Sequence, residues 1–217
     1  MKRSWPVLAL AAAIALIGCA GQKRVETRKP DPPGTLRSID GSVSIVMPAG
    51  WIAIDPHAGN AEKFSQQLGK KNSQINDYAD RSAGALLQAM SASEAQAKAA
   101  VKDTLSINSA PSGGKTAFTD REIQQYKRQY AAQMHPKGDV EMAPVKLDVG
   151  SGLRYSARLS IVLPNGKTVE TVNIGYLIFH GDESYVVTFT TAPERAKSMK
   201  KIAERAMKTL SFGPANR

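Results

Sequence analysis

Leu153–Thr191 reads LRYSARLSIVLPNGKTVETVNIGYLIFHGDESYVVTFTT and carries the strongest strand signal of the chain. Apolar and polar residues alternate from its first residue up to Asn165-Gly166, a dipeptide that strongly favours a two-residue hairpin turn. The pattern resumes over Thr168–Phe179, turns at Gly181-Asp182-Glu183 and returns over Ser184–Thr190. The stretch therefore predicts three antiparallel strands joined in a meander.

A helix is predicted on each side of this meander. Before it, Thr119 and Glu122 form the S/T-x-x-E pattern of a capping box. After it, Thr191 and Glu194 repeat the pattern and predict the start of a terminal helix. The first helix has one apolar side, made by Ile123, Tyr126, Tyr130 and Met134. The terminal helix has an apolar stripe (Ala196, Met199, Ile202, Ala203, Ala206, Leu210) and a basic face (Arg195, Lys197, Lys200, Lys201, Arg205, Lys208).

Shorter signals come earlier in the chain. Val43–Met47 alternates, Pro48-Ala49-Gly50 turns the chain, and Trp51–Ile54 returns, which predicts a hairpin with Trp51 as a core anchor. Ala85–Met90 is compatible with a strand or a buried helix, and we favour a strand. Further strands are predicted over Thr104–Asn108 and Val145–Val149, and helices over 61–82 and 93–101. An antiparallel meander needs cover for its apolar face, so the fold class is α+β, with helices packed on a mainly antiparallel sheet as an α-β-α sandwich.

The chain also resembles a known family. The resemblance lies in Val43–Trp51 (VSIVMPAGW), Thr104–Pro111 (TLSINSAP), Gly175–Thr191 (GYLIFHGDESYVVTFTT) and Leu210-Ser211-Phe212, which together look like the PsbP-like fold. This fold is shared by an extrinsic subunit of photosystem II, a nuclear-transport factor that binds a small GTPase, and bacterial envelope lipoproteins. The resemblance covers about residues 40–212 and implies an adaptor or assembly role, but it transfers no binding residue.

The N-terminus has the pattern of an export signal. Lys2 and Arg3 precede an apolar run of about thirteen residues, Trp5–Ile17, which is shorter than the roughly 20 residues of a spanning helix. The run ends in Leu16-Ile17-Gly18-Cys19, which resembles a lipobox. We therefore expect cleavage before Cys19 and lipidation of this residue, with diacylglyceryl and a further acyl chain such as palmitate. The alternative is an ordinary signal peptide, but no Ala-x-Ala pattern stands at the end of the run.

Three segments follow from this interpretation. Residues 1–18 are a lipoprotein signal peptide, residues 19–37 a lipidated cysteine with a flexible tether, and residues 38–217 a PsbP-like globular domain. The tether is rich in proline and charge, and its Lys23, Arg24, Arg28 and Lys29 serve either to attract anionic headgroups or only to keep the linker soluble. The protein would face the periplasm in the cell envelope, and Ala20 favours the outer membrane if the host is Gram-negative.

No sequence motif supports catalysis, and no cofactor-binding motif is found. Ser112-Gly113-Gly114-Lys115-Thr116 ends like a phosphate-binding loop, but Ser109 stands where the first glycine is needed, so a surface turn is expected. Gly150-Ser151-Gly152 is too short for a serine-hydrolase elbow. Adjacent Asp182 and Glu183 would face opposite sides of a strand, a poor arrangement for paired acid–base chemistry.

A metal site is not expected either. His57, His135 and His180 are far apart, and Cys19 is the only cysteine, which also excludes an intramolecular disulfide. We expect a turn histidine in water at His180. The formal charge of +10 falls to +8 without the signal, and to +5 for residues 38–217. An exported, mildly basic domain meets anionic lipid, glycan or acidic protein but little nucleic acid, so nucleic acid is discounted as a partner.

Two functional hypotheses follow. The first, which we prefer, is a non-enzymatic, membrane-anchored lipoprotein that binds a protein of unknown identity or helps to assemble an envelope complex. The second is a lipoprotein that binds a small ligand, or hydrolyses one, in a cleft between helix and sheet. An exposed apolar patch would favour the first, and a deep pocket with convergent polar groups the second. The basic face of the terminal helix is either a docking surface for acidic protein or membrane, or a solvated helix side.

Overall fold

The structure is a computed structural model that describes residues 31–54, 85–93, 96, 99–163 and 166–213. Cys19, the predicted signal peptide, most of the predicted tether and the helix expected over 61–82 lie outside these residues. Of the helix expected over 93–101, residues 94–95 and 97–98 lie outside them, and residues 99–101 are not helical. Residues Pro32–Arg217 form one compact unit. No helix of the described residues is long and apolar enough to cross a membrane.

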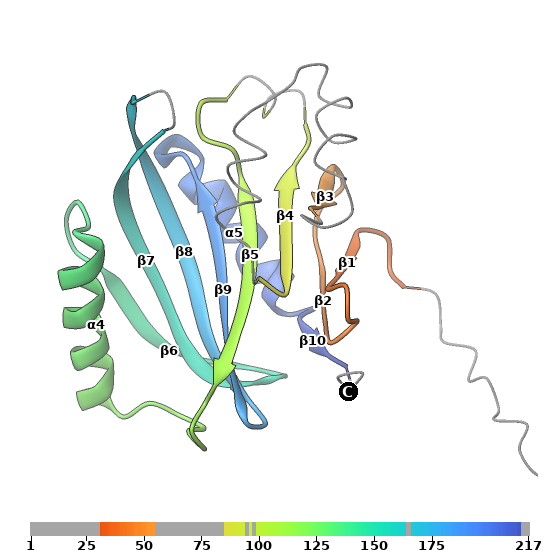
Figure 1. Ribbon diagram of the computed structural model, residues 1–217, viewed down its shortest axis with the longest axis vertical. Coiled ribbons are helices and arrows are strands. Elements are labelled where there is room, and N and C mark those ends of the chain that lie inside the picture. Colours follow the sequence, from red (N-terminus) through yellow and green to blue (C-terminus); the bar gives the residue numbers. More distant parts are fainter. Residues whose placement is uncertain (1–30, 55–84, 94–95, 97–98, 164–165, 214–217) are drawn as a thin grey trace, which may run out of the picture. The chain divides into compact units, whose positions relative to one another are not determined.

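The strands form two antiparallel sheets (Figure 1). The large sheet has seven strands in the order β3-β4-β5-β9-β8-β7-β6, and the small sheet has the order β1-β2-β10. The elements, in chain order, are β1 (Thr35–Arg37), β2 (Val43–Val46), β3 (Trp51–Ala53), β4 (Leu87–Ser91), β5 (Thr104–Pro111), α4 (Asp120–Met134), β6 (Glu141–Leu147), β7 (Gly150–Val162), β8 (Thr168–His180), β9 (Glu183–Thr191), the 3-10 turn η1 (Pro193–Arg195), α5 (Ala196–Met207) and β10 (Ser211–Phe212).

The predicted meander is confirmed as β7, β8 and β9. The β8–β9 hairpin closes with His180 opposite Glu183, and Gly181 has a φ of 59°, which favours glycine at this loop position. The β7–β8 loop closes through the Leu163 amide, which donates to the Lys167 carbonyl at 2.9 Å. Strand β6, at the edge of the sheet, accommodates Pro144 because an edge position need not donate a ladder hydrogen bond.

Helix α5 covers one face of the large sheet, called here the α5 face. In Figure 1 this helix lies behind the strands. Alternate side chains of β8 point into this layer because successive residues of a strand face opposite sides. The resulting core is made by Leu87, Ala89, Leu105, Ile107, Val172, Ile174, Tyr176, Ile178, Val187 and Phe189 of the strands and Met199, Ala203, Ala206 and Met207 of the helix.

Helix α4 packs on the opposite side, called here the α4 face. Its capping box forms as predicted: the Thr119 side chain accepts from the Glu122 amide, and the Glu122 carboxylate accepts from the Thr119 amide at 2.8 Å. Tyr130 and Ala131 pack against a small cluster of Val140, Ala157 and Leu159. With one helix on each face, the α+β class and the α-β-α sandwich are confirmed.

Two local predictions are wrong. The hairpin over Val43–Ile54 does not form, because β2 pairs with β1 and β10 whereas β3 pairs with β4. The Gly50 carbonyl accepts from the Ala92 amide at 2.7 Å, which joins the turn to β4 instead of folding it back on β2. The pattern of alternation shows where a strand lies but not which strand it pairs with.

The second capping box also fails. No side chain caps η1 or α5, and the Thr191 hydroxyl instead donates to Oδ1 of Asp103 at 2.5 Å. Arg195, expected on the basic face, turns inward, where its Nε donates to the same Asp103 oxygen at 3.0 Å. A buried carboxylate needs hydrogen-bond donors and a counter-charge. Leaving the Asp103 carboxylate without them would cost more free energy than a helix cap contributes.

Candidate functional site

The centre of the α4 face is built around a tyrosine that lies across a glycine. Tyr155 on β7 is paired with Gly175 on β8, which is paired in turn with Thr188 on β9. A Cβ atom on Gly175 would lie 2.0 Å from Cζ of Tyr155. Without it, the phenol ring extends over β8 until its hydroxyl is 3.2 Å from Oγ1 of Thr188. The missing side chain is therefore what lets one residue span three strands.

Further hydroxyl and amide groups continue this arrangement. Thr190 on β9 donates to Oδ1 of Asn173 on β8 at 3.0 Å, and the Tyr130 phenol of α4 is hydrogen-bonded to the same Asn173 side chain. The Tyr130 and Tyr155 rings are 5.1 Å apart. We call Tyr130, Tyr155, Asn173, Thr188 and Thr190 the hydroxyl row. Burial raises the pKa of the Tyr155 phenol, and it is also the largest cause of the raised pKa of Tyr130. Both phenols therefore remain neutral hydrogen-bonding groups.

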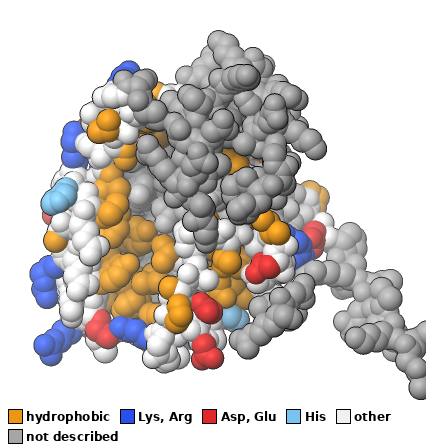
Figure 2. All heavy atoms as spheres, viewed as in Figure 1, with side chains coloured by type: hydrophobic (Ala, Val, Ile, Leu, Met, Phe, Trp, Pro, Cys, Tyr) orange, Lys and Arg blue, Asp and Glu red, His pale blue; other side chains and the backbone are white. Residues whose placement is uncertain are grey.

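Apolar and aromatic side chains adjoin the hydroxyl row. Phe118, which precedes α4, packs on Phe179 of β8 with ring centroids 4.9 Å apart and on Tyr126 of α4 at 6.1 Å. Val186, on the same face of β9, is half-buried, as are Phe118 and Tyr126. Figure 2 shows hydrophobic side chains gathered over the strands beside α4. We call Phe118, Tyr126, Phe179 and Val186 the aromatic floor.

This face has the chemistry of a binding surface. In the described part of the chain the hydroxyl row is hydrogen-bonded within itself, Tyr155 to Thr188 and Thr190 to Asn173. Tyrosine, threonine and asparagine supply both donors and acceptors beside an apolar surface. This mixture, without charged groups at its centre, is typical of the core of a protein–protein interface.

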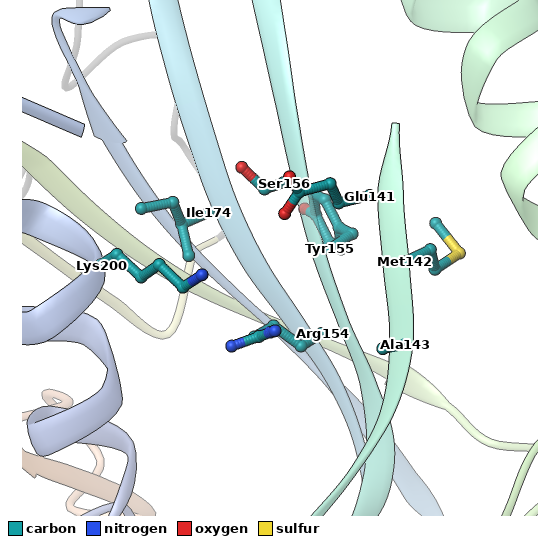
Figure 3. A pocket seen from close by; sticks show the side chains of 8 residues that line it. All are labelled: Glu141, Met142, Ala143, Arg154, Tyr155, Ser156, Ile174 and Lys200. Carbon is teal, nitrogen blue, oxygen red and sulfur yellow. The ribbon is translucent and has the colours of Figure 1, made fainter. Parts of the chain in front are cut away.

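A small pocket opens on the other side of the sheet, between β6, β7 and α5 (Figure 3). Its volume is about 30 Å³, enough for a water molecule and far below the roughly 300 Å³ of small-ligand sites. Arg154 and Lys200 line it, and Arg154 Nη1 is 3.1 Å from Oε1 of Glu204. A second depression of about 320 Å³, beside Val101 and Arg195, is wide open to solvent.

Asp103 organises a buried polar cluster beside that depression. Besides Thr191 and Arg195, it interacts with Gln96, whose Nε2 donates to Oδ2 of Asp103 at 2.8 Å. Nζ of Lys102, which is 9 % exposed, donates to the Gln96 carbonyl, and burial, then the nearby Arg195 charge, lowers the Lys102 pKa. The cluster joins the start of β5 to the end of β9 and to η1, so we assign it a structural role.

The motifs that were discounted as catalytic or metal-binding have structural roles. Ser112–Thr116 is a surface turn in which Lys115 Nζ lies 2.6 Å from Oε1 of Glu122 and 4.5 Å from the Phe118 ring centre. His135 ends α4 in the left-handed conformation, with a φ of 46°. Nδ1 of His180 donates to the Val149 carbonyl, 2.9 Å away, and the His180 ring packs on Phe212. Among the described residues no group of three or more potential metal ligands occurs.

The structure places the remaining predicted residues as follows. Cys19 and His57 lie outside the described residues. Trp51 is in the main core, 9 % exposed, as predicted. The hydroxyl row was missed, although Gly175 inside an apolar strand is a signal of close approach by another group. Asp103 carried no sequence signal, because its partners are brought to it only by folding.

Comparisons with known proteins give only structural similarities. No protein-family model matches the chain, and no curated protein matches it. Among solved structures, a protein from Bacteroides thetaiotaomicron matches over 85% of this chain with 12% identity and a TM-score of 0.43, and this chain spans 50% of its length.

Three further structures match over most of both chains. The cyanobacterial PsbP of Synechocystis is 12% identical, with a TM-score of 0.44, over 82% of this chain and 91% of that one. The Ran-binding protein Mog1p of Saccharomyces cerevisiae is 10% identical, with a TM-score of 0.47, over 82% of this chain and 94% of that one. LpqN of Mycobacterium tuberculosis, which is involved in cell envelope biogenesis, is 10% identical, with a TM-score of 0.44, over 83% of this chain and 90% of that one. The first two are the kinds of protein that the sequence resemblance names. At these scores the similarities transfer neither partner nor activity to this chain.

Proposed function

We propose that this chain is a non-enzymatic lipoprotein of the cell envelope that binds a protein partner through the α4 face. In this proposal residues 1–18 are removed and Cys19 is lipidated. Residues 20–31 then connect the lipidated cysteine to the compact unit that begins at Pro32 and hold this unit at the membrane. Strand β1 takes up residues 35–37 of the expected tether, which shortens the flexible part. The domain would face the periplasm, from the outer membrane in a Gram-negative host.

The observation that carries the binding role is that Phe118, Tyr126 and Val186 of the aromatic floor remain half-buried beside the hydroxyl row, while Phe179 is buried. A partner segment with apolar side chains would pack on Tyr126 and Val186, and its backbone amides and carbonyls would pair with Thr188 and Asn173. The pocket in Figure 3 supports the alternative of a small-ligand carrier less well, because about 30 Å³ holds only water.

Site-specific photo-crosslinking in the native host tests this proposal. A photoreactive phenylalanine analogue replaces Tyr126 or Val186, and the matched control position is Gln124, which is exposed on the same helix as Tyr126. We expect one discrete protein adduct from positions 126 and 186 and none from position 124. Equal adducts from all three positions, or none from a correctly localised protein, would contradict protein binding by this face.

The lipid anchor is tested separately. Metabolic labelling with a fatty-acid analogue should mark the natural chain but not Cys19→Ala, and the crosslink from position 186 should weaken when the anchor is removed. A natural chain that stays unlabelled would refute the lipoprotein assignment while leaving the crosslinking result valid. Recovery of a small molecule instead of a protein would favour the ligand carrier.

A further inference from the structure

The outer surface of α5 carries a row of four basic residues, with one acidic residue, Glu204, beside it. Lys197, Lys201, Arg205 and Lys208 are all exposed, and their spacing of four, four and three residues places them on one side of the helix. We call these four residues the cationic stripe, which is about 16 Å long. Within the described residues none of them forms an ion pair, whereas the only acidic residue of the helix, Glu204, is engaged by Arg154.

This arrangement is unfavourable for an isolated helix. Like charges four residues apart destabilise a helix, and a surface that serves solubility alone is usually of mixed sign. Helix α4 illustrates the difference: its Asp120 and Glu122 accompany Arg121 and Lys127. The stripe therefore has the pattern of a surface that meets an anionic partner.

The small sheet places this stripe beside the point where the chain enters the domain. Val46 in β2 is paired with Thr35, the first residue of β1, and the Val46 amide donates to Oγ1 of Thr209 at 2.9 Å. Thr209 follows the end of α5 by two residues. Since neighbouring strands are about 4.8 Å apart, the chain enters the domain within about 10 Å of the C-terminal end of the cationic stripe.

We propose that the cationic stripe binds the anionic surface of the membrane to which the chain is tethered, an inference that rests on the proposed lipid anchor. The tether expected over residues 20–31 would span roughly 20 Å on average, so the stripe would be within reach of the surface that holds Cys19. Each basic residue near an anionic bilayer strengthens binding about fivefold. Because α4 and α5 lie on opposite faces of the sheet, this orientation directs the α4 face away from the membrane.

Co-sedimentation with vesicles tests the stripe without the anchor. The processed chain carrying Cys19→Ser is mixed with vesicles of phosphatidylcholine containing about 30% phosphatidylglycerol, or of phosphatidylcholine alone. We compare K197Q/K201Q/K208Q with the matched variant R121Q/R128Q/K146Q, which removes the same charge from exposed positions on α4 and on the α4 face of β6. Glutamine preserves helix propensity, so both variants should fold, and the stripe variant should melt no lower than the matched variant because it removes like-charge repulsion.

The expected result is preferential binding to anionic vesicles, reduced about a hundredfold in the stripe variant and by threefold or less in the matched variant. Raising the salt concentration to about 0.5 M should release the protein, since salt screens exposed charges. Equal losses in the two variants would overturn the proposal, because net charge alone would then explain binding. Retention of an acidic protein but not of anionic vesicles would overturn it too.

The orientation is tested with the lipidated chain in the same vesicles. Because lipid occupies the only natural thiol, a fluorophore can be attached to S198C on α5 or to Q124C on α4. Quenching by lipids that carry a quencher in the headgroup should be several-fold stronger at position 198. Stronger quenching at position 124 would overturn the proposed orientation. If the chain acquires no lipid, the proposed anchor is contradicted. The co-sedimentation experiment, which does not need the anchor, then tests membrane binding by the cationic stripe alone.

Discussion

Neighbouring residues of β9 show how differently the two faces of the sheet are used. Val187 and Phe189 point to the α5 face and have no exposed surface, whereas Val186 and Thr188 between them point to the α4 face and remain half-buried. The α5 face is sealed by the apolar stripe of an amphipathic helix together with Leu36, Val43 and Ile45 of the small sheet. The α4 face combines an aromatic floor with hydroxyl groups. One face therefore stabilises the fold, and the other retains surface that a partner can bury.

The largest expected effect comes from opening the α5 face. Phe189→Ala should lower the free energy of unfolding by about 4 kcal/mol, because it leaves a cavity in a closed core. The matched change on the other face, Val186→Ala, should cost about 1 kcal/mol or less, because this side chain is only half-buried. Urea denaturation measures both values. Similar losses would show that the α4 face is as tightly packed as the α5 face.

A methyl group at Gly175 should disrupt the hydroxyl row. Gly175→Ala forces the Tyr155 ring away from Thr188 and should cost about 2 kcal/mol through overpacking and the lost hydrogen bond. In a Tyr155→Ala background the same substitution should cost almost nothing, since the atoms nearest to the new Cβ all belong to Tyr155. A double-mutant cycle measured by thermal unfolding checks this coupling. Additive effects would mean that another group opposes the methyl.

A charge on the aromatic floor should weaken partner binding more than folding. Val186→Asp should reduce the crosslinked adduct from position 126 about tenfold, because a desolvated, unpaired carboxylate is unfavourable inside an interface. Its melting temperature should change by only a few degrees, because position 186 is half-exposed in the unbound protein. Crosslinking yield is measured alongside circular dichroism. An undiminished yield would place the partner elsewhere.

Alkaline pH should destabilise the protein through its buried tyrosines. Burial raises the pKa of Tyr130 and Tyr155 on the α4 face, and that of Tyr176 on the α5 face to about 12, from the ordinary value of 10. The folded state therefore holds protons that the unfolded state releases, so this stability is complete below pH 10 and is lost as the pH rises above it. Melting temperatures at pH 9 and pH 11 should differ less in Tyr130→Phe/Tyr155→Phe. An unchanged difference would assign the effect to other tyrosines whose pKa burial also raises, namely Tyr126, Tyr176 and Tyr185.

The smallest effect is expected at the start of α4. The hydrogen bond from Lys115, followed by those from Thr119, lowers the pKa of Glu122 from 4.5 to about 2. The contribution of the Glu122 carboxylate to stability is present above pH 4.5 and is lost as the pH falls towards 2, because protonation removes the negative charge that Lys115 and Thr119 stabilise. The protection factor of the first-turn amides of α4, which is the intrinsic exchange rate at each pH divided by the measured rate, should fall over this range in the natural chain. In Glu122→Gln this protection factor should be lower at pH 6 and nearly independent of pH.

The sequence predicted the elements whose cause is local. The period of two in β7–β9, the glycines of their turns and the Thr119–Glu122 capping box depend on residues within a few positions of one another, and the structure contains all of them. Trp51 was placed in the core for the same kind of reason. The strand predicted at residues 85–90 also forms, shifted to 87–91.

Predictions failed where the partner is distant in the chain. Thr191 has the same sequence context as a helix cap, but Asp103, 88 residues earlier, takes its hydroxyl. Arg195 belongs by spacing to the basic face, yet the same carboxylate draws it inward. In the sequence, Gly175 is only a residue that weakens a strand. In the folded chain it makes room for the Tyr155 ring, which crosses it to reach Thr188.

The strands of the meander, the capped helix α4 and the α+β class could therefore be predicted from the sequence, because each is encoded in short periods and adjacent residues; export and lipidation stay predictions. Which strands pair, which polar groups satisfy the buried Asp103, and that the cationic stripe lies beside the entry of the chain while the hydroxyl row lies on the opposite face could be seen only in the folded chain. These properties arise from contacts between residues far apart in sequence, where burial makes each unsatisfied polar group costly and so selects one partner among many.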